Sequence, residues 1–283
     1  MLNQGFDDCP TVSSAFKLID AFEGLLERDS LPSDLSRNQA ELMAQYAEDL
    51  REVASLFHRE RVRSAEGFYL EREGPPLYDN MPPVAGSLYW VRGLLERVSS
   101  PMAKFRGSMR QLIDADESAE VLAQHDGLMQ LLTEYESTTF DAWAGGLEET
   151  SAAKLRQPLL VRDETSRLLS VNFDPELVRL LREAFYLQQI SEREIPAAAA
   201  QLSKQREPFR VLRGNLQLIA GKYNQMHLTI LDVERPLLER ELRAIDNLLE
   251  QGLTHLTWKS VDVQTFVKQA LHDVSATHGR LSV

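Results

Sequence analysis

The chain has 283 residues, of which 43% are hydrophobic and 26% are charged, and this composition excludes a disordered or collagen-like polypeptide. Asp and Glu outnumber Lys and Arg by 43 to 31. This excess argues against nucleic acid and anionic membranes as main partners, because both bind clustered positive charge. No apolar run reaches the ~18 residues of a membrane helix, and the N-terminus lacks a signal peptide pattern, which together predict a cytoplasmic protein.

Residues 1–70 predict an N-terminal helical hairpin. Apolar side chains recur every three or four residues over 11–28 and again over 35–63, a spacing typical of amphipathic helices. Ser13 or Ser14 is expected to cap the first of these helices. The short segment LPSD separates the two, so they are expected to pack as an antiparallel pair.

A proline-rich segment, EREGPPLYDNMPP at residues 71–83, follows this hairpin. It holds four of the chain's 12 prolines. Because proline lacks a backbone donor and restricts the residue before it, the segment predicts a linker or a fixed bend that ends at Pro82 and Pro83.

Residues 84–153 predict a helical bundle. Its first helix is expected to weaken or kink near Pro101, and a second helix is expected over 117–145. Tyr89 and Trp90 lie about 100° apart around the first helix, so one face cannot easily bury both. One of the two is therefore expected to meet a neighbouring helix or another chain.

Residues 154–190 predict a β-hairpin followed by a helix. Two short β-prone runs, at 158–161 and 168–173, flank the polar segment DETSR. Asp174 is expected to cap the following helix, with Pro175 at the first helical position, where its missing N–H costs nothing.

Residues 191–283 predict a C-terminal helical bundle. The helical pattern is expected to be interrupted near Pro208, Gly221 and Pro236, and Pro236 should lie at a kink or a helix start. A heptad-like apolar stripe follows, and Gly252 is expected to end that helix as a C-terminal cap before Trp258 enters a last helix. The stripe consists of Leu238, Leu242, Ile245 and Leu249. The whole chain is therefore expected to be mainly α, an elongated series of helical hairpins and bundles with one small β-hairpin at about residues 158–173.

The usual signatures of catalysis are missing from the sequence. The nearest match to a phosphate-binding loop, at Gly221-Lys222-Tyr223, lacks the first glycine and the hydroxyl that would reach a magnesium ion. None of the six histidines lies three to five residues from another, which is the usual spacing of zinc-binding pairs. We therefore expect a segment that is no enzyme, with no cofactor, metal or small-molecule substrate, and we expect its partners to be proteins.

Four segments resemble, in the same order, the N-terminal tail of dynein heavy chains, and they are most similar to the axonemal dyneins of cilia and flagella. The resemblance covers about residues 9–260. The segments are CPTVSSAFKLIDAFEGLLERDSL, PPVAGSLYWVRGLLERVSSPM, PLLVRDETSRLLSVNFDPELVRLLREAFYL and ERPLLERELRAIDNLLEQGLTHLTWKS.

The resemblance implies a non-catalytic piece of the stem of an ATP-driven microtubule motor, whose ATPase ring lies far downstream. In that family the tail joins heavy chains to one another, carries intermediate and light chains, and docks the complex to its cargo or, in cilia, to the doublet microtubule. The implied partners are therefore another heavy chain, intermediate and light chains, and docking factors. The implied location is the cytoplasm and cytoskeleton, and the axoneme of a cilium or flagellum. The alternative is a stand-alone helical adaptor that kept the tail fold but has no motor.

Candidates for structural or interface roles come from the proline and aromatic positions of these segments. They are expected to act through packing and contacts. The candidates are Pro82, Pro83, Tyr89, Trp90, Asn172, Phe173, Pro236 and Trp258.

Overall fold

The structure, a computed structural model, is mainly α-helical with one two-stranded antiparallel sheet, which confirms the expected fold class. The chain divides into two compact units, residues 1–141 and 142–283. Among the described residues, no helix is both long and apolar enough to cross a bilayer. The structure describes residues 12, 14–17, 35–65, 81–108, 113, 118–190, 193–231 and 233–281.

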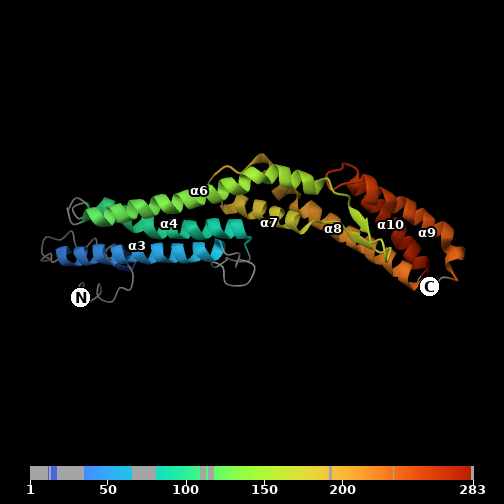
Figure 1. Cartoon of the computed structure of the whole chain (residues 1–283), viewed down its shortest axis with the longest axis horizontal. Helices are drawn as coiled ribbons and strands as arrows, with labels where there is room; N and C mark the ends of the chain where they lie inside the picture. The colour runs from blue at the N-terminus through green and yellow to red at the C-terminus, as the bar shows by residue number, and fades with distance from the viewer. Residues whose placement is uncertain are drawn as a thin grey trace. The chain divides into compact units, whose positions relative to one another are not determined.

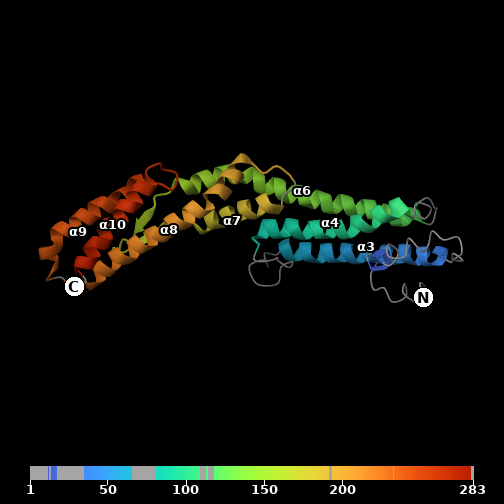
Figure 2. The ribbon, with the colours of Figure 1, turned by 180° about the vertical axis from the view of Figure 1, so that it is seen from behind.

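The long helices among the described residues of the first unit are α3 (Leu35–Ala65), α4 (Pro83–Ser108) and the N-terminal part of α6 (Ala119–Leu155). Helices α3 and α4 lie side by side in both views (Figures 1 and 2). The expected turn between the first two helices and the proline-rich segment up to residue 80 lie outside the described residues.

Aromatic side chains fill the core of the first unit. Tyr46, Phe57 and Phe105 are fully buried, and the ring of Phe105 meets that of Phe16 edge to face at 5.0 Å. The Tyr46 hydroxyl donates a hydrogen bond of 2.7 Å to the carbonyl of Val98, so the one polar atom of this ring is satisfied inside the core. Burial raises the pKa of that hydroxyl above its ordinary value.

The second unit combines the hairpin with a helical bundle. Strand β1 (Leu160–Arg162) pairs antiparallel with β2 (Leu169–Val171), with Leu160 opposite Val171 and Arg162 opposite Leu169. The helices are α7 (Pro175–Ile190), α8 (Ala197–Thr229), α9 (Arg235–Glu250), the π-helical turn η4 (Gln251–His255) and α10 (Val263–Leu281). Helix α8 is central to this unit, since it packs against α7, α10 and β2 (Figure 1).

The start of α7 agrees with the expected capping pattern. The Asp174 carboxylate accepts a hydrogen bond of 2.8 Å from the backbone N–H of Glu176, and Pro175 is the first helical residue. Lys154, near the end of α6, reaches the same carboxylate at 2.6 Å and that of Glu176 at 3.1 Å. The cap therefore also ties α6 to α7.

The expected helix interruptions were only partly correct. Helix α4 continues through Pro101 to Ser108, and α8 runs unbroken through Pro208 and Gly221. Proline in a helix interior costs ~3 kcal/mol and glycine about 1 kcal/mol. Buried side chains along α8, such as Phe209, offset that cost by packing. Pro236, in contrast, does lie at a helix start, one residue after the first residue of α9.

Gly252 has a different role from the expected one. It does not end the helix as a cap, because the chain continues from α9 into η4, and the glycine is buried within that turn. A Cβ atom placed at Gly252 would lie 2.8 Å from Cζ of Phe266 on α10. The missing side chain therefore lets the α10 ring approach the backbone closely.

Candidate functional site

Pro82 and Pro83 form the entry to α4. The Pro82 carbonyl accepts a hydrogen bond of 2.8 Å from the N–H of Gly86, and Pro83 is the first residue of the helix. Proline fits this position because its fixed φ matches a helix and its missing N–H has no helical partner there. The described residues thus show a proline helix start, whereas the expected bend extends into residues outside them.

Tyr89 and Trp90 face different surroundings, as their angular separation on the helix indicates. Trp90 is 7% exposed, and its ring stacks on that of Phe57 at 6.0 Å with an interplanar angle of 10°. Tyr89 is 42% exposed. Trp90 is therefore a core residue of the first unit, and Tyr89 contributes to its surface.

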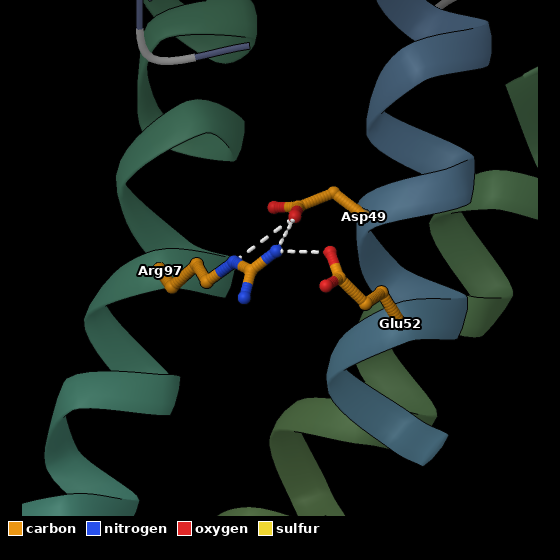
Figure 3. Close-up of polar contacts among 3 residues, drawn as sticks. All are labelled: Asp49, Glu52 and Arg97. Carbon is orange, nitrogen blue, oxygen red and sulfur yellow. Dashed lines mark hydrogen bonds and ion pairs between the residues drawn. The ribbon is translucent and has the colours of Figure 1, made fainter. Parts of the chain in front are cut away.

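Polar contacts also fix α4 against its neighbours in the first unit. The Arg97 guanidinium lies between two carboxylates of α3 (Figure 3): its Nε donates to Asp49 at 2.9 Å and its Nη2 contacts both Asp49 and Glu52, the latter at 2.5 Å. Hydrogen bonding to Asp49 raises the pKa of Arg97 further above its ordinary value. On the neighbouring face, Arg92 pairs with Glu136 of α6 at 2.6 Å.

Three of the candidate residues in the second unit come together. The indole Nε1 of Trp258 donates a hydrogen bond of 2.7 Å to the carbonyl of Asn172, and the Trp258 ring meets that of Phe173 edge to face at 4.5 Å. The Asn172 side chain in turn donates to the Pro158 carbonyl at 3.0 Å. Trp258 lies in the turn before α10 and not within the helix, so its expected place in a last helix was wrong.

Pro236 lies at a pocket that the sequence did not reveal. The pocket has a volume of about 530 Å³ and opens between the hairpin, the C-terminal end of α8 and the start of α9. Its lining residues are Arg162, Arg167, Tyr223, Met226, His227, Ile230, Arg235, Pro236, Glu239, Leu242, Arg243 and Asp246. We call it the arginine pocket.

A hydrogen-bonded triad forms one wall of the arginine pocket. Arg162 of β1 donates to the hydroxyl of Tyr223 at 2.7 Å and to the carboxylate of Asp246 at 3.0 Å, and that hydroxyl donates to the same carboxylate at 2.8 Å. The Arg162 guanidinium also lies 5.3 Å from the Tyr223 ring centroid. Each member comes from a different element, so the triad ties β1, α8 and α9 together.

The histidine of the pocket, His227, is partly buried and lies near several arginines. Burial, followed by the nearby charges of Arg235 and Arg162, lowers the pKa of His227 below its ordinary value, against a smaller opposite effect of Asp246. The His227 ring stacks on Tyr223 at 6.1 Å. Burial likewise raises the pKa of Tyr223, and its hydrogen bond to Asp246 adds to that rise.

Sequence reasoning missed both the triad and the Arg97 cluster for one reason. Their hydrogen-bonded partners are separated by between 23 and 84 residues, and only the fold brings them together. No cluster of three or more His, Cys, Asp or Glu side chains placed to hold a metal ion occurs in the described ranges.

Comparison with known proteins shows what the chain is similar to. Residues 1–266 match the family model described as "Dynein heavy chain, N-terminal region 1". The "Dynein beta chain, flagellar outer arm" of Chlamydomonas reinhardtii is 34% identical over 95% of this chain, and the "Dynein beta chain, ciliary" of Heliocidaris crassispina is 33% identical over 97%. The human "Dynein axonemal heavy chain 9" is 33% identical over 96%.

The match covers a small part of these relatives. The chain spans about 6% of the length of each of the three. The matched part is their N-terminal region, as the family model states. The chain therefore belongs to the dynein heavy chain family, as a form of its N-terminal region, and these three relatives are axonemal, ciliary and flagellar dyneins.

Proposed function

We propose that the chain is a non-catalytic segment of a dynein heavy chain tail. In this role it associates with another heavy chain, binds intermediate and light chains, and takes part in docking a microtubule motor complex. The observation that carries the proposal is the extent of the family match, residues 1–266 of 283. ATP-driven movement is proposed only for a full-length heavy chain, through parts outside this region.

The internal contacts support a scaffolding role. In the first unit, the Arg92–Glu136 and Arg97–Asp49 pairs join α4 to α6 and to α3. In the second unit, the Arg162 triad and the Trp258–Asn172 hydrogen bond join the hairpin to the surrounding chain. Contacts of this kind hold helices in one arrangement, as a segment that transmits force between subunits needs.

The surface of the described residues also supports binding to proteins. Several large apolar side chains are exposed there, and apolar surface is a common feature of protein interfaces. They are Tyr89, Val161, Val211, Leu218, Leu228, Leu231, Val233, Leu237 and Val261. The names of the relatives place those proteins in flagella, cilia and axonemes, so we propose the axoneme as the site of action of this chain as well.

The size of the native protein tests this proposal. An antibody against this chain is used on immunoblots of isolated cilia and of deciliated cell bodies, together with density-gradient fractions of a high-salt axoneme extract. We expect a band far larger than 32.1 kDa in cilia that co-sediments with dynein intermediate chains. A band near 32.1 kDa outside those fractions would instead support the stand-alone adaptor.

A further inference from the structure

The arginine pocket concentrates positive charge in a chain whose formal net charge is -12. Four arginines line it, against two carboxylates, Glu239 and Asp246. Both carboxylates already have partners, because Glu239 pairs with Arg243 and Asp246 with Arg162. Of the four arginines, Arg167 has no carboxylate partner among the described residues.

We propose that the arginine pocket binds an acidic segment of a partner protein, with a partner carboxylate on Arg167 and Arg162 and adjacent apolar side chains on Leu231, Val233 and Leu237. This inference rests on the proposed function, because it gives the chemistry of one partner. The contact with the acidic segment would lie in the second unit.

Arg167 provides the available charge. Its side chain is exposed, it lines the pocket, and no carboxylate of the described residues forms an ion pair with it. Its φ of 59° lies in the left-handed region, which is unfavourable for a residue with a side chain. A glycine would relieve that strain, and backbone strain of this kind is often found at binding sites.

Arg162 is held ready for a second contact. Tyr223 and Asp246 accept two of its N–H groups and fix the guanidinium plane at the wall of the pocket. A guanidinium has further N–H donors, and its planar geometry matches a carboxylate. An oriented arginine loses little side-chain entropy when it binds an anion. The triad therefore preorganises Arg162 for binding in the free protein.

Exposed apolar side chains lie next to the charge. Leu231 is 62% exposed, Val233 80% and Leu237 82%. Leu231 and Val233 belong to the turn between α8 and α9, and Leu237 to the first turn of α9. In the sequence, Leu231 follows the lining residue Ile230 and Leu237 follows the lining residue Pro236. Apolar surface beside a cationic pocket matches a peptide that alternates acidic and apolar side chains, and it offers nothing to the backbone of a nucleic acid.

The overall charge also favours a protein segment over a polyanion. A duplex needs an extended basic surface, whereas the rest of this chain is acidic and would repel it. A pocket of about 530 Å³ can hold a few side chains. The partner is therefore recognised locally, through a short acidic and apolar stretch.

Histidine protonation provides a readout specific to this pocket. The groups that face His227 are Tyr223 of α8, Arg162 of β1, Arg167 of the hairpin, and Arg235 and Asp246 of α9. A bound carboxylate offsets the positive charges that lower the pKa of His227, so binding raises that pKa. By linkage, the affinity for the acidic segment increases as the pH falls through the His227 pKa of the bound state.

The test uses the full 283-residue chain and a fluorescent peptide of alternating glutamate and leucine. The matched probe has glutamine at each glutamate position, and a short DNA duplex is the polyanion control. We expect the glutamate peptide to bind, Arg167→Gln to weaken binding about tenfold, and Arg167→Lys to retain most of it. The variant control is Arg210→Gln, which removes an exposed arginine from α8, about 20 Å along the helix from Tyr223.

Each outcome bears on the proposal. Tighter binding at lower pH, with a shift of the His227 ring signal in NMR spectra, supports it. Equal binding of the glutamine peptide or of DNA overturns it, as does equal affinity of wild type and Arg167→Gln. Thermal unfolding of each variant shows whether it is folded. Failure here leaves the dynein tail assignment intact, because that assignment depends on native size and co-sedimentation.

Discussion

The indole Nε1 of Trp258 donates a hydrogen bond of 2.7 Å to the backbone carbonyl of Asn172, 86 residues away in the sequence. Trp258 is 4% exposed and also meets Phe173 edge to face. Trp258→Ala removes both contacts and leaves a cavity, so we expect a loss of ~3 to 5 kcal/mol in the free energy of unfolding. Trp258→Phe keeps a ring but leaves the carbonyl without its donor, for a loss of about 1 to 3 kcal/mol.

Urea denaturation of the two variants measures both losses. A Trp258→Phe variant as stable as wild type would show that the hydrogen bond makes no net contribution to the free energy of unfolding. A third variant, Trp258→Leu, is expected to lie between the other two, since it fills part of the cavity without the ring contacts.

Tyr89 and Trp90 form a matched pair, because they are neighbours with opposite burial. Trp90→Ala should lower the free energy of unfolding by ~3 to 5 kcal/mol, since it removes the ring that stacks on Phe57. Tyr89→Ala should lower it by less than about 1 kcal/mol, because that side chain lies at the surface. If the proposed tail function holds, Tyr89→Ala should reduce subunit binding more than stability, which co-sedimentation tests. Equal destabilisation by both changes would contradict the assignment of Trp90 to the core.

The Asp174 cap predicts that the stability of the fold depends on pH in the acidic range. Hydrogen bonding to Lys154, followed by that to the Glu176 N–H, lowers the pKa of Asp174 below its ordinary value. A carboxyl group with a lowered folded pKa stabilises the fold above its unfolded pKa of about 3.9, and this effect is lost as the pH falls through the folded pKa. Urea midpoints from neutral pH down to about pH 3 should therefore fall less steeply for Asp174→Asn than for wild type. Parallel slopes would show that another group controls acid unfolding.

Gly252→Ala tests the close approach of α10 to η4. The added Cβ would lie 2.8 Å from Cζ and 3.0 Å from Cε1 of Phe266, so the ring must shift. We expect a loss of about 1 to 3 kcal/mol in the free energy of unfolding, as for other overpacked sites. Gly214→Ala in α8 is the control, because a Cβ there meets nothing within 4 Å, and helix propensity predicts a gain of roughly 0.5 to 1 kcal/mol.

Arg167→Gly separates stability from binding. Relief of the left-handed backbone at this position should raise the free energy of unfolding by about 1 kcal/mol. The same change removes the available charge of the arginine pocket and should weaken binding of the acidic peptide. A variant that becomes less stable would show that the Arg167 side chain has a structural role instead.

Local patterns in the sequence were enough to predict much of the fold. The β-hairpin, the Asp174 cap and the helix start at Pro236 depend on short-range chemistry, and the structure confirms them. Pro208 and Gly221 do not interrupt α8, because packing of this long helix on its neighbours outweighs their low intrinsic helix propensity.

The candidate site was less accessible to sequence reasoning. Asn172, Phe173 and Trp258 were singled out separately, and their contact became visible only in the structure. The arginine pocket was missed because its charges are dispersed along the chain, at residues 162, 167, 235 and 243, and form no basic run. A patch assembled from dispersed residues leaves no local pattern, although Arg167 at the end of the polar segment DETSR is a weak sign of a charged turn.

The position of Trp258 also determines when the second unit can fold during synthesis. The hairpin strands are translated long before the segment that covers them, since Leu159 donates a backbone hydrogen bond to Leu256 and Pro158 bridges to Thr257. Closing loops of this length is slow and delays long-range pairing. Until residues 256–258 have left the ribosome, the hairpin therefore lacks the partners of Pro158 and Leu159 and the ring of Trp258 that packs on Phe173.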